Sequence, residues 1–250
     1  MCCVRRTLTG VGAVVVVLFG TAIAAAETLP TTAVPAATPA AAPALPGPPR
    51  IDESWTARIL YPVAARRTPG GRSVMSLRHY TPYSQGPGIY MVTDAKVVKK
   101  KTWIRIQLPK RPNGTQGWVP EAAVDVRRNV TWIRVKTGSR TVQVFRKGVR
   151  IKTFRAAVGT GGTPTPKGLF AIWDPVPTGG QLGPYILVLT AHSNVLRTFA
   201  GGDGIVGIHG WPNSGVLGQA VSHGCVRMSR DGVRGLSRYA APGVPVEIVA

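Results

Sequence analysis

The amino-acid sequence predicts a mainly β protein, and three observations support this fold class. Apolar and polar residues alternate in several short segments, which is the pattern of strands with one buried face. Glycine and proline are frequent, at 30 and 22 of 250 residues, and they divide the chain into short elements. The sequence also lacks long segments with the apolar spacing of an amphipathic helix.

The N-terminal segment has the features of an export signal. Arg5 and Arg6 precede an apolar run over residues 11–26, which is shorter than the roughly 20 residues of a membrane-spanning helix. Three alanines at residues 24–26 fit a cleavage site. We expect residues 1–26 to be a signal peptide and the protein to be exported to the cell wall or the periplasmic space. If it stayed uncleaved, this segment would anchor the protein in the membrane.

Residues 27–50 are almost entirely Ala, Pro and Thr, and they show no periodic apolar face. Such a composition cannot bury a core, and its proline content favours an extended, semi-rigid chain. We therefore expect a linker that holds the folded part of the protein away from the membrane or the export site.

The remaining sequence contains short patterns that predict individual elements. Residues 102–108 (TWIRIQL) alternate in polarity, and residues 141–151 predict a hairpin because two alternating runs flank a Lys-Gly pair. Residues 185–189 and 204–208 are short apolar runs, which are typical of buried strands. Residues 231–239 have apolar residues at spacings of three, which favours a short helix.

The chain is strongly basic, with 31 Lys and Arg residues against 10 Asp and Glu residues and a net charge of +21. Such a charge attracts polyanions. We expect the anionic cell envelope, and not nucleic acid, to be the partner, because an exported protein rarely meets nucleic acid. Residues 96–105 are the one segment in which dense basic residues accompany an aromatic side chain of the kind that stacks on bases.

We place a domain boundary near residues 127–130, which leaves residues 51–127 as one β-domain and residues 128–250 as another. In the first of these, GWVPEAAV at residues 117–124 resembles the last strand and 3₁₀ turn of bacterial SH3-like domains. In those domains a Trp-Val pair enters the barrel and the proline starts the turn. The resemblance implies a small SH3-like barrel, of a kind that often accompanies cell-wall enzymes.

Cys225 is the one cysteine that remains after removal of the expected signal peptide, which contains Cys2 and Cys3. An oxidising compartment favours paired cysteines, so a lone one indicates a reactive thiol; a small buried apolar residue is the alternative interpretation. Cys225 follows His223 by two positions and His209 by sixteen. An imidazole can take the proton of a thiol and later protonate a leaving amine. Cys225 with either histidine is therefore a candidate nucleophile and base.

Two neighbouring residues fit the same chemistry. Gly224 lets the backbone turn, so that N–H groups near Cys225 can point at an oxyanion. Arg227 lies two positions beyond Cys225, on the same face of a strand, where it is placed to bind a substrate carboxylate.

Other arrangements of the histidines fit less well. A metal site could use His209, His223 and Cys225, but these residues lack the paired spacing of structural zinc sites. Cysteine peptidases that are fused to SH3-like modules place the histidine after the cysteine, and no histidine follows Cys225. We assign structural roles to His79 and His192. No metal and no other cofactor is expected.

Three segments in order resemble the L,D-transpeptidase (YkuD-type) catalytic domain. That family carries a Thr-Pro-x-Gly-x-Phe stretch, a His-Gly pair, and Ser/Thr-His-Gly-Cys followed by an aliphatic residue and Arg or Asn. This sequence has TPKGLF at residues 165–170, HG at residues 209–210 and SHGCVR at residues 222–227. The resemblance covers roughly residues 130–250 and implies a β-sandwich-like catalytic domain.

The resemblance also implies roles for individual residues. Cys225 would be the nucleophile, and His209 rather than His223 the general base and acid. The carbonyl group of Gly210 would orient the other ring nitrogen of His209. The implied positions for oxyanion binding, loop support and substrate contact are Ser222, His223, Gly224 and Arg227.

The function implied by the resemblance is that of an exported peptidoglycan L,D-transpeptidase, which acts in cell-wall biogenesis and cell shape. Such an enzyme forms 3→3 cross-links through a cysteine thioester, and its partners are stem peptides: a donor tetrapeptide and an acceptor amine. Carbapenem-type inhibitors are implied as well. Two alternatives stay open, an L,D-carboxypeptidase that uses water as the acceptor and a non-catalytic wall-binding protein.

Overall fold

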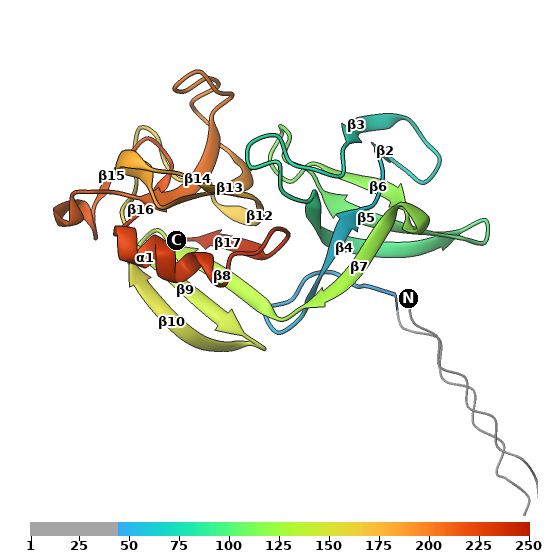
Figure 1. Cartoon of the computed structure of the whole chain (residues 1–250), viewed down its shortest axis with the longest axis horizontal. Helices are drawn as coiled ribbons and strands as arrows, with labels where there is room; N and C mark the ends of the chain where they lie inside the picture. The colour runs from blue at the N-terminus through green and yellow to red at the C-terminus, as the bar shows by residue number, and fades with distance from the viewer. Residues whose placement is uncertain (1–44) are drawn as a thin grey trace, which may run out of the picture. The chain divides into compact units, whose positions relative to one another are not determined.

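The computed structural model describes residues 45–250 (Figure 1). The expected signal peptide and most of the expected linker lie outside the described residues. Within residues 45–250 the protein is mainly β, which confirms the predicted fold class. No helix in this part of the chain is long and apolar enough to cross a membrane.

The N-terminal part of the described chain forms a seven-stranded antiparallel sheet in the order β3-β2-β6-β5-β4-β1-β7. The expected strand at residues 102–108 corresponds to β5. The SH3-like identity of this sheet stays a prediction. Its elements are β1 (Ser54–Ile59), β2 (Val63–Arg66), β3 (Ser73–Leu77), β4 (Ile89–Val98), β5 (Lys101–Gln107), β6 (Gln116–Pro120), the 3₁₀ helix η1 (Glu121–Ala123) and β7 (Val124–Asn129).

The C-terminal part forms an eight-stranded mixed sheet in the order β10-β9-β8-β17-β12-β13-β14-β16. The pairs β17–β8 and β14–β16 are parallel. Its strands are β8 (Thr131–Lys136), β9 (Thr141–Arg146), β10 (Val149–Arg155), β12 (Gly168–Pro177), β13 (Tyr185–His192), β14 (Ile205–Gly210), β16 (Val226–Met228) and β17 (Pro245–Val249).

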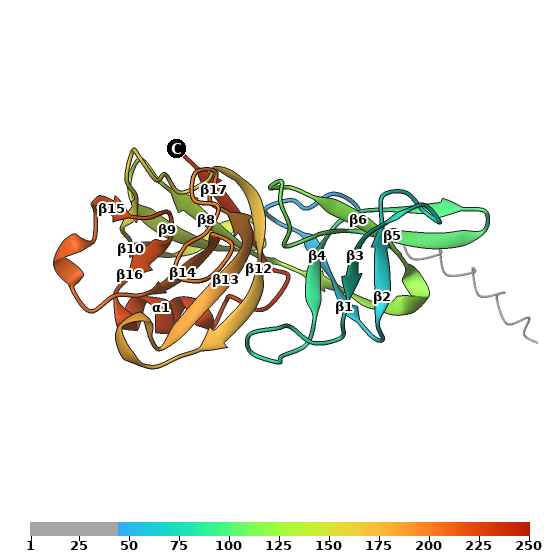
Figure 2. The same ribbon diagram turned by 90° about the horizontal axis from the view of Figure 1, so that it is seen from above.

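Smaller elements complete this part of the chain. A two-stranded parallel sheet joins β11 (Val158–Gly159) to β15 (Ala220–Ser222). Two 3₁₀ helices also occur: η2 (Gly180–Leu182) lies between β12 and β13 in the sequence, and η3 (Ser214–Val216) lies between β14 and β15. The helix α1 (Arg230–Ser237) lies against β13 and β14 (Figure 2).

The local sequence explains two of the predicted elements. The hairpin expected at residues 141–151 is β9–β10, and its turn residues Lys147 and Gly148 have φ angles of 50° and 77°. Two positive φ angles define the type I′ turn that matches the twist of a hairpin. The predicted helix is α1, whose first turn is capped by Ser229: its Oγ accepts the N–H of Gly232 at 2.9 Å.

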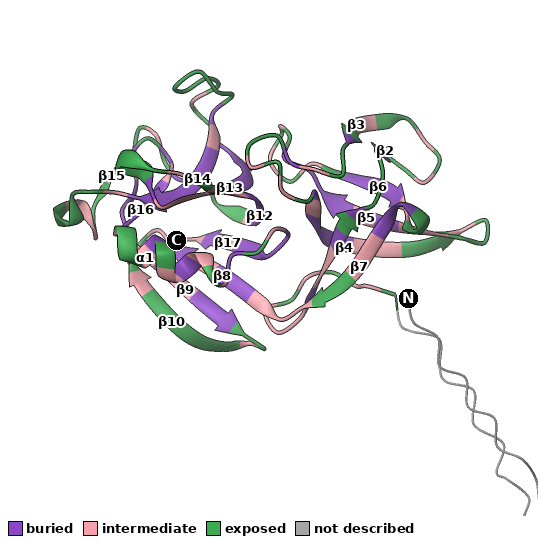
Figure 3. Cartoon of the chain, in the orientation of Figure 1, coloured by how far each residue is buried: buried purple, intermediate pink, exposed green. Residues whose placement is uncertain are grey.

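The strands and α1 enclose an apolar core that positions the candidate site. Figure 3 shows buried residues along the inner strands, whereas the edge strand β10 is exposed. The core includes Ile172, Leu187 and Ile208 from the sheet and Leu236 from α1, each fully buried. A second core joins the two sheets, because Trp173 of β12 packs with buried residues of the N-terminal sheet.

A buried carboxylate fixes the contact between these two sheets. Asp174 of β12 is 0% exposed. Its side chain accepts the backbone N–H groups of Tyr83 and Ser84, both at 3.1 Å, and the hydroxyl group of Ser84. The loop between β3 and β4 is thereby held on the strand that leads toward the candidate site.

We predict that Asp174→Ala lowers the free energy of unfolding by about 3 kcal/mol, because it removes hydrogen bonds to a charged group and leaves buried donors unpaired. Chemical denaturation measures this change. The control is Asp125→Ala, which breaks an ion pair with Arg127 at the surface and should cost less than about 1 kcal/mol. Equal losses in the two variants would contradict the structural role of Asp174.

Candidate active site

The parallel pairing of β14 and β16 brings together residues that are distant in the sequence. In this register His209 lies opposite Arg227, and Ile208 lies opposite Val226. Paired residues on neighbouring strands point to the same face, and residues two apart share that face. Cys225, which directly precedes β16, therefore lies on the face of His209 and Arg227. All three line one cavity of about 400 Å³.

His209 is held in a defined tautomer. Its ring is 6% exposed, and Nδ1 lies 2.8 Å from the carbonyl oxygen of Gly210. A carbonyl oxygen only accepts hydrogen bonds, so Nδ1 carries the proton and Nε2 keeps its lone pair. Burial lowers the pKa of His209; Arg227 adds to this shift, and the Gly210 hydrogen bond opposes it. The ring is therefore a neutral base at pH 7.

Gly210 has a steric reason to be glycine. A Cβ atom at this position would collide with the backbone carbonyl of Gly183, in the segment that follows η2. The close approach holds this segment against the end of β14, next to His209. Leu182, the last residue of η2, lines the cavity.

Cys225 as a whole residue is partly exposed, but its thiol group lies in a poorly solvated environment in the cavity. Burial raises the pKa of the Cys225 thiol, while a backbone hydrogen bond from Gly207 and the charge of Arg227 oppose the shift. With the lowered pKa of His209, this favours a neutral thiol and a neutral imidazole in the resting protein.

The loop before Cys225 is tied down by Ser222, which is 1% exposed. Its hydroxyl donates to the carbonyl oxygen of Cys225 at 2.5 Å and accepts the N–H of Gly224 at 3.2 Å. Gly224 has a φ of +117°, which residues with a side chain rarely adopt. Its N–H is thus engaged within the loop. The exposed ring of His223 lies on the cavity rim, where it packs against Phe199 with ring centroids 5.2 Å apart.

Arg227 is the one residue with a permanent charge among those that line the cavity. Its guanidinium group stacks on the ring of Trp211, 3.8 Å from the centroid. Within residues 45–250 its buried Nε has no hydrogen-bond partner. The side chain is thus held by the aromatic ring and presents its charge beside His209 and Cys225.

The TPKGLF segment supports the cysteine loop indirectly. The hydroxyl of Thr165 accepts the N–H of Gly159 at 2.9 Å. Gly159 in β11 pairs with Ser222 in β15, and the N–H of Thr160 donates to the Ser222 carbonyl at 3.0 Å. The segment therefore braces Ser222 through β11, and it does not itself line the cavity.

The other two histidines lie outside the cavity. His79 is exposed in the N-terminal sheet region. His192 is 1% exposed, and its Nε2 lies 3.1 Å from the carboxylate of Asp203. Within residues 45–250, no cluster of three or more His, Cys, Asp or Glu side chains could hold a metal ion.

Sequence reasoning did not find the apolar wall of the cavity. The apolar runs at residues 185–189 and 204–208 predicted buried strands, but no local pattern shows that these strands meet Leu182 and Phe199 at one cavity. The wall is formed by Leu182, Ile186, Val188, Phe199, Ile205 and Val206.

The loop that carries Phe199 is held by the N-terminal part of the chain. Residues 193–204, here called the 193–204 loop, connect β13 to β14. Arg111, between β5 and β6, donates to the carbonyl oxygens of three loop residues at 2.7–2.9 Å: Ser193, Leu196 and Asp203. Asn113 exchanges hydrogen bonds with the backbone of His192 at 2.7 and 2.8 Å. The base of the loop is therefore fixed from outside the C-terminal sheet.

Comparison with known proteins agrees with this architecture. The model of the L,D-transpeptidase catalytic domain family (YkuD) matches residues 130–248. A Bacillus licheniformis protein, named as a candidate L,D-transpeptidase YkuD, is 34% identical over 117 residues, which are 46% of this chain and 64% of that protein. The match thus spans less than two thirds of the relative's length.

Solved structures of L,D-transpeptidases are also similar. One from Mycobacterium smegmatis has 16% identity and a TM-score of 0.40, over 68% of this chain and 100% of that chain. The L,D-transpeptidase LdtMt1 in complex with imipenem has 17% identity and a TM-score of 0.40, over 63% and 98%. The match of the family model to residues 130–248 confirms the resemblance seen in the sequence.

We predict that Arg111→Ala increases hydrogen exchange across the 193–204 loop, because three backbone carbonyls lose their shared donor. Exchange measured by mass spectrometry reports this change for the peptide that contains Phe199. Lys110→Ala is the matched control, since the side chain of Lys110 donates to the carbonyl of Val74, within the N-terminal region. Unchanged exchange in Arg111→Ala would mean that the loop is fixed by other contacts.

Proposed function

We propose that this protein is a peptidoglycan L,D-transpeptidase that forms 3→3 cross-links through a thioester on Cys225. One observation carries the proposal: His209 and Cys225, sixteen residues apart in the sequence, line the same cavity of a domain of this family. The substrates are a donor tetrapeptide stem and an acceptor amine of a neighbouring stem. The protein acts after export, in the cell wall or the periplasmic space.

The first half-reaction forms the acyl-enzyme. Nε2 of His209 takes the proton of Cys225 as the sulfur attacks the carbonyl carbon of the third stem residue. Collapse of the tetrahedral intermediate breaks the amide bond to the terminal D-alanine. His209 then returns the proton to the leaving amine. The N–H groups of His223 and Cys225 are the candidate oxyanion donors, because that of Gly224 is engaged by Ser222.

The second half-reaction releases the product. The acceptor amine attacks the thioester carbonyl while His209 takes one of its protons. The carbon–sulfur bond breaks, a new amide bond forms, and the proton passes to the sulfur of Cys225. A thiolate leaves readily, so the chemistry of this cycle needs no further cofactor.

The cavity supports the proposed sequence of proton transfers. Since the resting thiol and imidazole are both neutral, proton transfer accompanies attack on the substrate instead of preceding it. Arg227, as the charged residue of the cavity, is placed to bind a carboxylate of the donor. Carbapenems, whose strained amide is open to the same attack, should acylate Cys225.

The first test is mass spectrometry of the protein after exposure to a donor tetrapeptide or a carbapenem. We predict an acyl adduct on Cys225 in the native protein, none in Cys225→Ala, and a retained adduct in His79→Ala, which alters an exposed histidine far from the cavity in sequence. Full acylation of Cys225→Ala would exclude the proposed nucleophile. Intact sacculus binding with no adduct in the native protein would instead favour a wall-binding function.

The product separates the transferase from a hydrolase. When a tetrapeptide is supplied with an acceptor amine, a transpeptidase yields the cross-linked peptide. An L,D-carboxypeptidase yields the tripeptide alone, because water takes the place of the amine.

The pH dependence of acylation tests the electrostatics of the cavity. We predict an acid limb, where His209 becomes protonated, at lower pH than for a free imidazole, and an alkaline limb, where no proton remains for the leaving amine, at higher pH than for a free thiol. Arg227 lowers both pKa values, so Arg227→Gln should move both limbs to higher pH. Arg234→Gln, which alters an exposed arginine on α1, is the control. Limbs that stay in place in Arg227→Gln would contradict the assigned coupling.

A further inference from the structure

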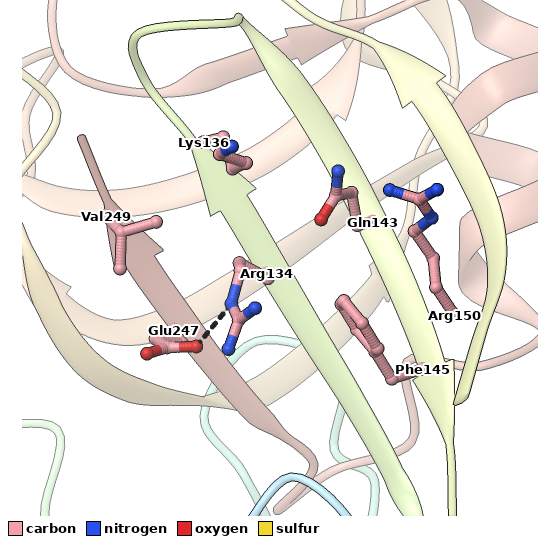
Figure 4. Close-up of a pocket in the computed structure, with 7 residues that line it drawn as sticks. All are labelled: Arg134, Lys136, Gln143, Phe145, Arg150, Glu247 and Val249. Carbon is pink, nitrogen blue, oxygen red and sulfur yellow. Dashed lines mark hydrogen bonds and ion pairs between the residues drawn. The ribbon is translucent and has the colours of Figure 1, made fainter. Parts of the chain in front are cut away.

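The outer face of the strands β10, β9, β8 and β17 carries an open groove of about 650 Å³ (Figure 4). Its lining includes three basic residues, one acidic residue, a glutamine and an aromatic ring: Arg134, Lys136, Arg150, Glu247, Gln143 and Phe145. None of them lines the cavity of Cys225. The groove, here called the Arg134 groove, is not used by the proposed reaction.

Strand register places Arg134 at the centre of the groove. On one side it lies opposite Gln143 of β9, and on the other it lies opposite Glu247 of β17. Lys136 is two residues further along β8 and so faces the same side. Arg150 of the edge strand β10 reaches the groove from the position opposite Phe145 (Figure 4).

The guanidinium group of Arg134 is held in a fixed orientation. Its Nε donates to Oε2 of Glu247 at 2.6 Å, and the same oxygen accepts the indole N–H of Trp132 at 3.2 Å. The guanidinium carbon lies 5.1 Å from the ring centroid of Phe145. Within residues 45–250 no other hydrogen bond engages the terminal nitrogens of Arg134. A guanidinium held in this way loses little entropy when those nitrogens bind an anion.

The charge around this guanidinium is unbalanced. Three basic side chains line the groove, and the one carboxylate, that of Glu247, is already engaged by Arg134. Arg134 and Lys136 lie two residues apart on β8 and face the same side, so their charges follow the direction of the strand.

We propose that the Arg134 groove binds phosphate groups of an extended phosphodiester polymer. Terminal guanidinium nitrogens match the geometry of a pair of phosphate oxygens, and Lys136 and Arg150 add point charges beside them. The groove is open along its length, so a polymer can lie across it without threading an end. This site does not depend on the chemistry of Cys225, and it would hold the protein on a phosphate-bearing envelope polymer.

Binding of a glycerol-phosphate oligomer to the full chain tests the proposal. Fluorescence anisotropy at physiological salt should show at least a tenfold weaker affinity for Lys136→Glu/Arg150→Glu. The matched variant Lys99→Glu/Lys100→Glu makes the same change of charge in the turn between β4 and β5, and its affinity should stay within about twofold of the native value. Equal losses in both variants would show that net charge alone drives binding and would overturn the proposal.

Two further binding measurements test which chemical groups of the protein and of the ligand interact. Arg134→Lys keeps the charge and removes the guanidinium fork, so affinity should fall about fivefold; an unchanged affinity would overturn the role of the fork. Polyglutamate of equal charge should bind at least tenfold more weakly than the phosphate oligomer. Tighter binding of polyglutamate would overturn the phosphate assignment, and tighter binding of single-stranded DNA would overturn the envelope polymer as the ligand.

The proposed transpeptidase activity serves as an internal control. The groove variants should form the acyl-enzyme on a soluble tetrapeptide at the native rate, which also shows that they are folded. A variant that forms the acyl-enzyme but no longer binds the oligomer supports the proposed binding site. A variant that forms the acyl-enzyme and still binds the oligomer overturns it. If the native protein forms no acyl-enzyme, the proposed function fails while the binding assay still decides the groove.

Discussion

The register of β14 against β16 is the constraint on which the candidate site depends. Side chains alternate between the two faces of a strand, so a slip of one residue would turn His209 into the core and move Arg227 away from it. Contacts before and after the pair of His209 and Arg227 hold this register. Before it, Ile208 and Val226 form a buried pair. After it, the backbone N–H of Trp211 donates to the carbonyl oxygen of Met228 at 2.8 Å.

Burial then decides the chemical state of the groups that the register assembles. A low-dielectric cavity disfavours both charged forms, which leaves Cys225 as a thiol and His209 as a free base. A neutral thiol is a poor target for oxidants. Arg227 limits the pKa shift of the thiol and places a positive charge in the cavity. One cavity thereby combines a neutral thiol, a neutral imidazole and a guanidinium group.

The sequence predicted the parts whose signals are local. Alternation marked β5 and the β9–β10 hairpin, spacing marked α1, and three short motifs marked the L,D-transpeptidase domain. It could not predict features that arise when distant segments meet. In the sequence, nothing distinguishes Asp174 from other acidic residues, because its role depends on the loop at Ser84 that packs on it. Likewise, nothing distinguishes Arg111 from other basic residues, because its carbonyl partners lie more than 80 positions away. Phe199 belongs to no sequence motif, and its position at the cavity becomes evident only from its packing against His223.

The state of the His209 ring is the most direct test of the account. Nitrogen NMR of imidazole-labelled protein, titrated from neutral to acid pH, reports both the tautomer and the pKa of this ring. The account predicts a proton on Nδ1, shared with the Gly210 carbonyl, and protonation of Nε2 only at lower pH than for a free imidazole. A proton on Nε2 at neutral pH, or a ring that is already cationic there, would contradict it, because neither form can take the proton of Cys225.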